Sequence, residues 1–231
     1  MSKELDIYAK SEHLLGIEES TEILHSIFVT LLEDEKINSV LDIGCGRGGL
    51  MKKLNALNIK TEGIDLSELM IEEALKSGLN VTCKNICEVR GTFKAATAVF
   101  DVLNFIPKNE IKSFFTCISN VLEEGGVFIA DINSESGFSE VAEGVMCAED
   151  EMMFLNVNAQ YEEEKLYTEF TLFEKCNDGH YEKSQEIIEQ YYYNLESLKN
   201  NGSLKLVEDH PLSLYDVDDK IILIFKKESK C

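Results

Sequence analysis

From residue 18 to about residue 132, the chain alternates between two hydrophobic periods. A helical period is clearest over residues 18–35, where Ile23, Ile27 and Leu31 recur on one face. Short apolar runs predict five strands, at residues 39–43, 60–64, 80–84, 94–100 and 126–132. Helices are expected between strands, at residues 48–57, 67–78 and 108–123, with Ser67 as the N-cap of the second. This succession predicts a parallel sheet with helices on both faces.

After residue 133 the pattern becomes antiparallel, with an Asp178-Gly179 hairpin turn. Three segments alternate as long strands, at residues 152–158, 165–175 and 181–193. The chain ends with a short helix at residues 195–200 and two strands that can form a hairpin, at residues 204–208 and 220–226. We therefore expect an α/β fold, with a Rossmann-like, doubly wound, mostly parallel seven-stranded sheet and an antiparallel β insertion.

The stretch LDIGCGRGG, residues 41–49, follows the first predicted strand and admits two ligands. Read as DxGxGxG, it is typical of the turn that holds S-adenosylmethionine. Through Gly44, Gly46 and Gly49 it also matches GxGxxG, which holds a dinucleotide pyrophosphate. Asp42 favours the methyl donor, because a carboxylate attracts the donor's ammonium and sulfonium groups and would repel a pyrophosphate. The alternative is that Asp42 only caps the following turn.

Two further positions fit a nucleoside. Asp65 ends the second predicted strand, where a carboxylate can accept the ribose hydroxyls of either an adenosine or a dinucleotide. Asn85 follows the third strand and can hydrogen-bond an adenine edge, with Ile86 packed on the ring. An ordinary surface asparagine is the alternative at position 85.

The charge balance excludes several classes of partner. The 231 residues hold 22 Lys plus Arg against 43 Asp plus Glu, a net charge of -21, so a nucleic-acid backbone or an anionic membrane is repelled over most of the surface. No apolar run approaches the roughly 20 residues that span a bilayer, and the N-terminal segment MSKELDIYAK has no signal core. We expect a cytoplasmic protein without a nucleic-acid or membrane partner.

The cysteines and histidines do not assemble a metal site. The seven cysteines form no CxxC pair and the four histidines are scattered, so no zinc-like spacing occurs. Several cysteines lie in apolar runs such as VTCKNIC. We therefore expect buried, reduced thiols and no metal ion.

Five segments resemble, in order and spacing, the motifs of class I S-adenosylmethionine-dependent methyltransferases: LDIGCGRG, GIDLSELM, KNICEV, AVFDVLNFI and EEGGVFIADINS. They cover about residues 37–134. The next segment resembles a bacterial group of small methyltransferases in which a strand-rich insertion covers the active site and begins with D-x-N-S, as at Asp131, Asn133 and Ser134. The resemblance implies four parts. Residues 1–36 would form an N-terminal helical segment over the donor site, residues 37–134 the donor-binding core, residues 135–194 the insertion, and residues 195–231 a C-terminal helix with the last two strands.

The resemblance also implies a cofactor, S-adenosylmethionine, which leaves as S-adenosylhomocysteine. Asp42 and the glycine turn would hold its amino-acid end, Asp65 its ribose and Asn85 its adenine. Asn85 replaces the commoner Asp of the family, which keeps an acceptor and loses a charge. The cofactor-binding residues implied are Asp42, Gly44, Cys45, Gly46, Asp65, Leu66, Asn85, Ile86 and Phe100.

Methyl transfer from a sulfonium is an in-line displacement that needs mainly alignment, and a general base helps if the acceptor is a hydroxyl or an ammonium. Asp101 and Asn104 are candidates, because doubly wound sheets bind ligands at the carboxyl ends of central strands. His13 is a third, and a surface histidine is the alternative there. We expect a small-molecule acceptor, methylated on O or N, and a monomer or homodimer. The alternatives are a donor-binding protein without catalysis, a protein methyltransferase and a nicotinamide-dependent oxidoreductase.

Overall fold

The computed structural model describes residues 2–215 and 217–228. The predicted alternation of strands and helices occupies its first half, and Ser67 caps its helix as predicted, its hydroxyl accepting the Met70 amide at 3.3 Å. The elements of this half are α1 (Ser2–Ser11), η1 (Glu12–Leu14), α2 (Glu18–Asp34), β1 (Ser39–Ile43), α3 (Gly49–Ala56), β2 (Lys60–Asp65), α4 (Glu68–Lys76), β3 (Val81–Cys83), η2 (Ile86–Glu88), β4 (Phe93–Ala98), η3 (Val102–Phe105), α5 (Ile111–Val121) and β5 (Leu122–Asn133).

The second half contains the predicted antiparallel strands together with three elements that the sequence pattern did not predict, η4, β6 and β10. Its elements are η4 (Gly137–Ala142), β6 (Gly144–Glu149), β7 (Met153–Glu162), β8 (Lys165–Lys175), β9 (Tyr181–Tyr191), α6 (Leu195–Leu198), β10 (Asn200–Asn201), β11 (Leu204–Leu212) and β12 (Lys220–Lys227). Buried residues alternate with less buried ones along β7, a pattern that is recognisable in the sequence, whereas β6 has no buried residue.

The central sheet has the order β10-β11-β12-β5-β4-β1-β2-β3. The strands from β3 to β5 are parallel, and β12 pairs antiparallel with both β5 and β11. This confirms the doubly wound, mostly parallel sheet of seven strands, to which the two-residue β10 adds an eighth at one edge. The chain changes winding direction between β1 and β4, and in such sheets a ligand crevice opens beside that point, at the carboxyl ends of the strands.

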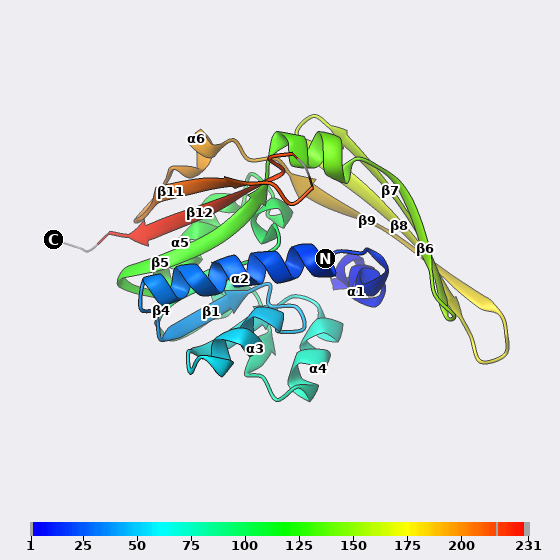
Figure 1. Ribbon diagram of the computed structural model, residues 1–231, viewed down its shortest axis with the longest axis horizontal. Helices are drawn as coiled ribbons and strands as arrows, with labels where there is room; N and C mark the ends of the chain where they lie inside the picture. The colour runs from blue at the N-terminus through cyan, green and yellow to red at the C-terminus, as the bar shows by residue number, and fades with distance from the viewer. Residues whose placement is uncertain (1, 216, 229–231) are drawn as a thin grey trace.

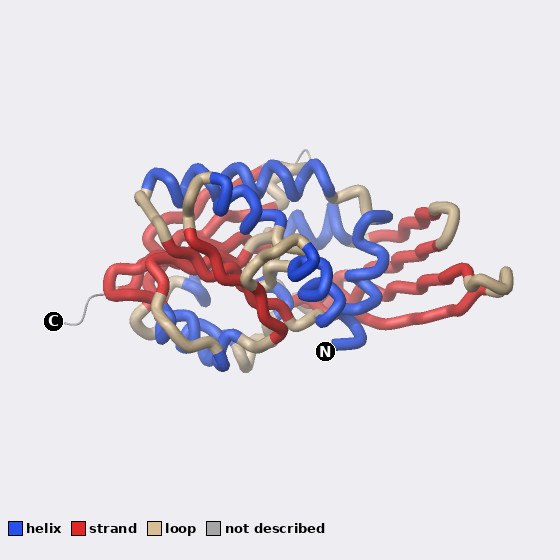
Figure 2. The backbone as a smooth tube through the Cα atoms, turned by 90° about the horizontal axis from the view of Figure 1, so that it is seen from below, coloured by secondary structure: helices blue, strands red, loops and turns tan. Residues whose placement is uncertain are grey.

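Helices cover both faces of the central sheet (Figures 1 and 2). On one face, Leu24 and Phe28 of α2 and Leu50 of α3 pack with Val40 of β1. On the other, α5 contributes Phe115, which lies edge-on to Phe128 and Phe225 of the sheet with centroids 5.8 and 5.0 Å away. These two apolar layers fix the sheet and therefore the positions of the loops at its carboxyl ends.

Strands β6 to β9 form a second, antiparallel sheet in the order β6-β7-β8-β9 that extends away from the core (Figures 1 and 2). One face of this sheet packs against α1, where Ile7 meets Leu155, Phe170 and Ile188. The N-terminal helix α1 therefore lies between the helices of the central sheet and the inserted sheet, in contact with α4, β8 and β9.

Candidate functional site

A cavity of about 1590 Å³ opens at the carboxyl ends of β1, β2 and β4 and continues along the inserted sheet. Every site residue predicted from the sequence lines this cavity except Asn104. The residues that the motifs place far apart in the chain are thus brought to one place by the parallel sheet.

The glycine turn after β1 owes its shape to three glycines with positive φ, Gly44 at 68°, Gly46 at 52° and Gly48 at 75°. A Cβ at Gly44 would also lie 2.6 Å from Cγ2 of Val102. The third glycine of the GxGxxG pattern has another cause, because a Cβ at Gly49 would lie 2.7 Å from Cε1 of His25. Gly49 is therefore needed for helix packing, and its presence does not indicate a pyrophosphate site.

Asp42 is buried below this turn, with a relative exposure of 3%, and accepts a hydrogen bond from the Thr97 hydroxyl at 2.8 Å. Burial raises the pKa of Asp42 to about 7, against the single favourable contribution from Thr97. A buried carboxyl group with so little compensation suits a cationic ligand, which would favour its ionised form. The residues present thus fit the ammonium end of S-adenosylmethionine.

Asp65, at the end of β2, accepts the backbone amides of Gly46 and Ser67 at 2.9 and 2.8 Å. Burial raises its pKa, while these two N–H groups oppose the shift. Because a carboxylate offers about four lone-pair positions, Asp65 keeps acceptor capacity for the two ribose hydroxyls.

Asn85 begins η2 and takes part in a capping box. Its side-chain oxygen accepts the Cys87 amide at 2.9 Å, and its own amide donates to the Glu88 carboxylate at 2.9 Å. The side-chain oxygen is therefore used locally, and its NH₂ group remains the part that could reach an adenine edge.

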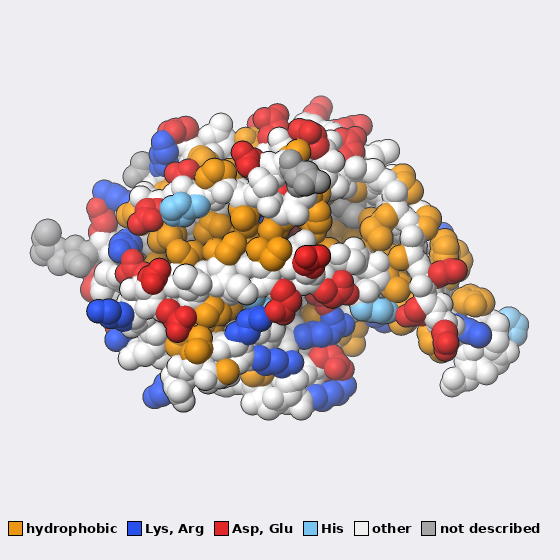
Figure 3. All heavy atoms as spheres, in the orientation of Figure 1, with side chains coloured by type: hydrophobic (Ala, Val, Ile, Leu, Met, Phe, Trp, Pro, Cys, Tyr) orange, Lys and Arg blue, Asp and Glu red, His pale blue; other side chains and the backbone are white. Residues whose placement is uncertain are grey.

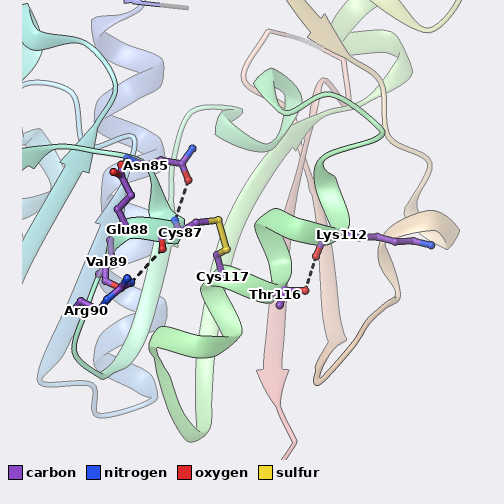
Figure 4. Close-up of a disulfide and its surroundings, with 8 residues drawn as sticks. All are labelled: Asn85, Cys87, Glu88, Val89, Arg90, Lys112, Thr116 and Cys117. Atoms are coloured by element: carbon purple, nitrogen blue, oxygen red, sulfur yellow. Dashed lines mark hydrogen bonds between the residues drawn. A yellow bond between two sulfur atoms is a disulfide. The ribbon is translucent and has the colours of Figure 1, made fainter.

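A disulfide between Cys87 and Cys117 ties η2 to α5, with their Cα atoms 4.9 Å apart (Figure 4). The expectation of buried, reduced thiols is thus wrong for this pair, and also for Cys83 and Cys147, which are exposed free thiols; Cys45 is a buried one. The error arises because the two bonded cysteines are 30 residues apart in sequence and meet only when η2 packs on α5. Cys231 lies outside the described residues.

The loop after β4 has an unusual backbone. Phe100 and Asp101 both adopt positive φ, 68° and 58°, which is costly for residues with side chains. The Asp131 carboxylate at the end of β5 compensates, because its oxygens accept the Phe100 amide at 2.6 Å and the Asp101 amide at 3.0 Å. As a result of this turn, Asp101 lines the cavity.

Lys220, the first residue of β12, completes a buried charged cluster. Its ammonium donates to Asp101, to Asp131 at 3.1 Å and to Asn133 at 2.9 Å. Burial alone would lower the pKa of Lys220, but the Asp101 and Asp131 carboxylates outweigh it and raise the pKa. Gln190 of β9 donates to Asp101 at 2.9 Å, so the cluster also connects the core to the inserted sheet.

The other two predicted catalytic candidates, Asn104 and His13, are not part of the Lys220 cluster's ion pairs. Asn104 is fully buried, and its amide group donates to the Tyr191 carbonyl at 2.9 Å and accepts the Asn133 amide at 2.9 Å. It bridges the core and β9 and does not face the cavity. His13 lies at the rim, where Nε2 is 3.0 Å from the Asp150 carboxylate and its side chain is 48% exposed.

The N-terminal segment is anchored to the glycine turn and borders the cavity. Arg47 of the glycine turn pairs with Glu12 and donates to the Ala9 carbonyl at 2.6 Å. Tyr8 lines the cavity, and its ring is edge-on to Phe170 of β8 at 6.2 Å. Burial raises the pKa of Tyr8 well above its usual value, helped by the nearby Glu12 carboxylate.

Sequence reasoning missed Arg47, Gln190 and Lys220. The sequence signal for Lys220 was a lysine at the start of an otherwise apolar terminal strand, KIILIF.

Among residues 2–215 and 217–228, no group of His, Cys, Asp and Glu is arranged to hold a metal ion. In the same part of the chain, no helix is long and apolar enough to cross a membrane.

Comparisons with known proteins agree with this geometry. The sequence model of a family described as a methyltransferase domain matches residues 40–126. A protein of Geobacillus sp. strain WCH70 assigned as a methyltransferase is 27% identical over 172 residues, which are 69% of this chain and 70% of that protein.

Two solved structures share the fold over nearly the whole chain. An S-adenosylmethionine-dependent methyltransferase from Clostridium acetobutylicum has a TM-score of 0.79, with 24% identity and 98% of each chain covered. The sugar N-methyltransferase KedS8 from Streptoalloteichus has a TM-score of 0.75, with 13% identity, 100% of this chain and 94% of that chain covered. With its glycine turn and the acidic residues at the ends of β1 and β2, the chain is similar to class I S-adenosylmethionine-dependent methyltransferases and shares their fold.

Proposed function

We propose that the protein methylates a small-molecule acceptor on O or N by in-line displacement. The observation that carries the proposal is the single cavity, which runs from the donor-binding turn to the inserted sheet and is bordered by α1. A chamber with walls on several sides suits a small acceptor better than a protein chain, and excluding water favours displacement by the intended nucleophile. The sugar N-methyltransferase with the same fold is in keeping with an acceptor of this size.

The roles of the residues follow from their positions. S-adenosylmethionine, when bound, supplies a methyl group activated by a sulfonium. Asp42 would pair with the donor's ammonium, and Asp65 would accept the ribose hydroxyls. Ile86 would pack on the adenine, and Phe100 would separate the donor from the acceptor side. Asp101 is the charged group nearest to that boundary, and we assign it to contact with the acceptor.

The test is to bind S-adenosylhomocysteine to the purified protein by calorimetry and then to measure its production from S-adenosylmethionine with a panel of small amines and alcohols. Binding together with turnover of a panel member is the expected result. No binding at millimolar ligand would contradict the proposal. Binding with no turnover across a broad panel would favour a donor-binding protein that has lost catalysis.

A cytoplasmic location and a monomeric or dimeric state are part of the proposal. The Cys87–Cys117 disulfide offers a direct check of location, because cytosolic thiol systems keep most protein cysteines reduced. Trapping the thiols by alkylation at the moment of cell lysis would show which form is present, and sedimentation would give the oligomeric state.

A further inference from the structure

The acceptor half of the cavity combines two kinds of wall. Along the inserted sheet, apolar side chains line the cavity from three neighbouring strands, and Thr168, Glu189 and Gln190 are polar neighbours among them. The apolar residues are Val157, Ala159, Leu166, Phe170 and Ile188. These residues retain only a few per cent of exposure, because they also pack in apolar clusters with Ile7 and Phe138, and the surface that they leave open to the cavity is apolar. Phe105 of η3 and Tyr8 of α1 continue the apolar wall on the side of the core.

A second part of the cavity wall, beside β9, carries a negative charge. Two buried carboxylates, Asp101 and Asp131, share one ammonium, that of Lys220, so the cluster has one more negative than positive charge when all three groups are ionised. Burial raises the pKa of Asp131, but Lys220 and two backbone amides donate to its oxygens, and donors of this kind favour the ionised form.

Within the cluster, the Asp101 carboxylate can still accept a hydrogen bond from a ligand in the cavity. Asp101 accepts Lys220 on Oδ1, and on Oδ2 it accepts Gln190 at 2.9 Å and Asn133 at 3.2 Å. Three of its about four lone-pair positions are therefore occupied. Its side chain keeps 11% exposure and lines the cavity, so one further N–H or O–H donor can reach it.

Positive charge along the cavity is compensated by other residues. The Lys and Arg residues that line it, among those described, are Arg47, Lys84 and Lys220. Each has a carboxylate partner: Glu12 for Arg47, Glu62 for Lys84 at 3.4 Å, and the buried cluster for Lys220. An anionic acceptor would meet no unpaired Lys or Arg there, whereas a cationic one would meet Asp101.

From these two walls we infer that the acceptor is a primary or secondary amine that carries an apolar, ring-sized or larger group. The inference rests on the proposed function and names the acceptor class of the same site. The ammonium would bind at Asp101, and the apolar group would lie along β7, β8 and β9. The carboxylate would also offset the repulsion between a cationic acceptor and the sulfonium of the donor.

The reaction balances without any further reagent. The bound ammonium first gives one proton to Asp101, which passes it to solvent. The amine lone pair then forms a bond to the methyl carbon while the carbon–sulfur bond breaks, and that bonding pair stays on sulfur. The products are an N-methylated ammonium and a neutral thioether.

The test uses the complex of the full-length protein with S-adenosylhomocysteine and calorimetric titration with three ligands at pH 7. Phenethylamine has both features, 2-phenylethanol lacks the charge and ethanolamine lacks the apolar group. Phenethylamine is expected to bind at least about tenfold more tightly than either. Asp101→Asn should remove its advantage over the alcohol, whereas Glu182→Gln, at an exposed position far along β9, should preserve it.

Equal binding of the amine and the alcohol would overturn the charge requirement, and equal binding of ethanolamine would overturn the apolar one. The inference also fails if benzylamine, phenethylamine and 3-phenylpropylamine all leave the complex unchanged at millimolar concentration. Failure of S-adenosylhomocysteine itself to bind would instead contradict the proposed function. Unchanged affinity of Asp101→Asn for S-adenosylhomocysteine serves as the check that this variant is folded.

Discussion

Asp42 and Lys220 are both buried ionisable residues, but they differ in how well their charges are compensated. Lys220 has two carboxylate partners, whereas Asp42 has the Thr97 hydroxyl. Burial raises the pKa of Asp42 from its usual value of 3.8 to about 7. The raised folded-state pKa means that protonation favours folding: the contribution of Asp42 to stability is present below about pH 4 and is lost as the pH rises through about 7.

Donor binding should therefore be coupled to proton release. A cationic donor favours the ionised form of Asp42, so binding at pH 7 is expected to release a proton, which calorimetry detects as a dependence of binding enthalpy on the buffer. Asp42→Asn should abolish this release and weaken S-adenosylmethionine binding by about 10- to 100-fold. Glu22→Gln, which removes an exposed partner of Lys53, is the matched control. Wild-type affinity in Asp42→Asn would mean that Asp42 only caps the turn.

Lys220 should contribute far more to stability than an exposed lysine of the same strand. Lys220→Met leaves Asp101 and Asp131 buried without their cation and is expected to lower the free energy of unfolding by about 3–5 kcal/mol. Lys226→Met, which breaks the exposed pair with Glu35, should cost about 1 kcal/mol or less. Urea denaturation measures both values. Similar losses in the two variants would show that the cluster contributes no special stability.

At the scale of elements, η2 is positioned by its disulfide as well as by its capping box. The bond closes a loop with a sequence separation of 30, which corresponds to about 3–4 kcal/mol of stability in the chain-entropy model. The Cys87→Ser/Cys117→Ser double variant should lose about this amount in urea denaturation and should bind S-adenosylhomocysteine more weakly, because η2 carries the predicted adenine contacts. Cys147→Ser, at an exposed free thiol, should change neither property. Unaltered stability of the double variant would refute the structural role of the bond.

At the same scale, the contacts of Arg47 are expected to hold the helix α1 in place. Arg47→Gln removes the pair with Glu12 and the bond to the Ala9 carbonyl, so residues 2–14 should open more often. Hydrogen exchange in this segment is expected to accelerate about tenfold, with a smaller effect once S-adenosylhomocysteine is bound. Lys53→Gln, which breaks a surface pair between α3 and α2, is the control. Exchange at the wild-type rate would mean that α1 is held by its apolar contacts alone.

At the scale of the whole molecule, the net charge of -21 is unevenly distributed. On the face shown in Figure 3, Lys and Arg side chains gather over α3 and α4, and Asp and Glu gather over η4. Lys53 and Lys76 in the basic region are paired with Glu22 and Glu73. The paired lysines and the overall charge both oppose phosphate binding.

The protein should accordingly show no measurable affinity for duplex DNA or RNA at about 150 mM salt. Fluorescence anisotropy with a labelled 20-base-pair duplex measures this. Lowering the salt to about 20 mM should not reveal binding either, because repulsion between like charges grows as screening is removed. Binding that strengthens at low salt would show that the lysines of α3 and α4 act as a local basic patch.

Much of the fold could be predicted because hydrophobic periodicity is a local property. The boundaries of β1 and β8 match the predicted ranges, and β2 and β12 differ by one residue. Of the elements that the pattern did not predict, β6 has no buried residue, η4 is a single helical segment of six residues, and β10 has two residues. Whether a short, irregular segment becomes a strand depends on the neighbour available to pair with it.

The sequence by itself determined the sheet type, the glycine turn and the acidic residues of the donor side, because each of these follows from residue order within one strand–loop–helix unit. The tertiary structure alone decided the Cys87–Cys117 bond, the burial of Asn104 and the cluster that joins Asp101 to Lys220. Those partners are separated by 30 to 119 residues and come from different strands and loops. The contacts of Asp101 and Asn104 exist because β12 pairs with β5 and β9 lies beside η3, and the disulfide exists because η2 packs on α5. None of these proximities is encoded in a local pattern.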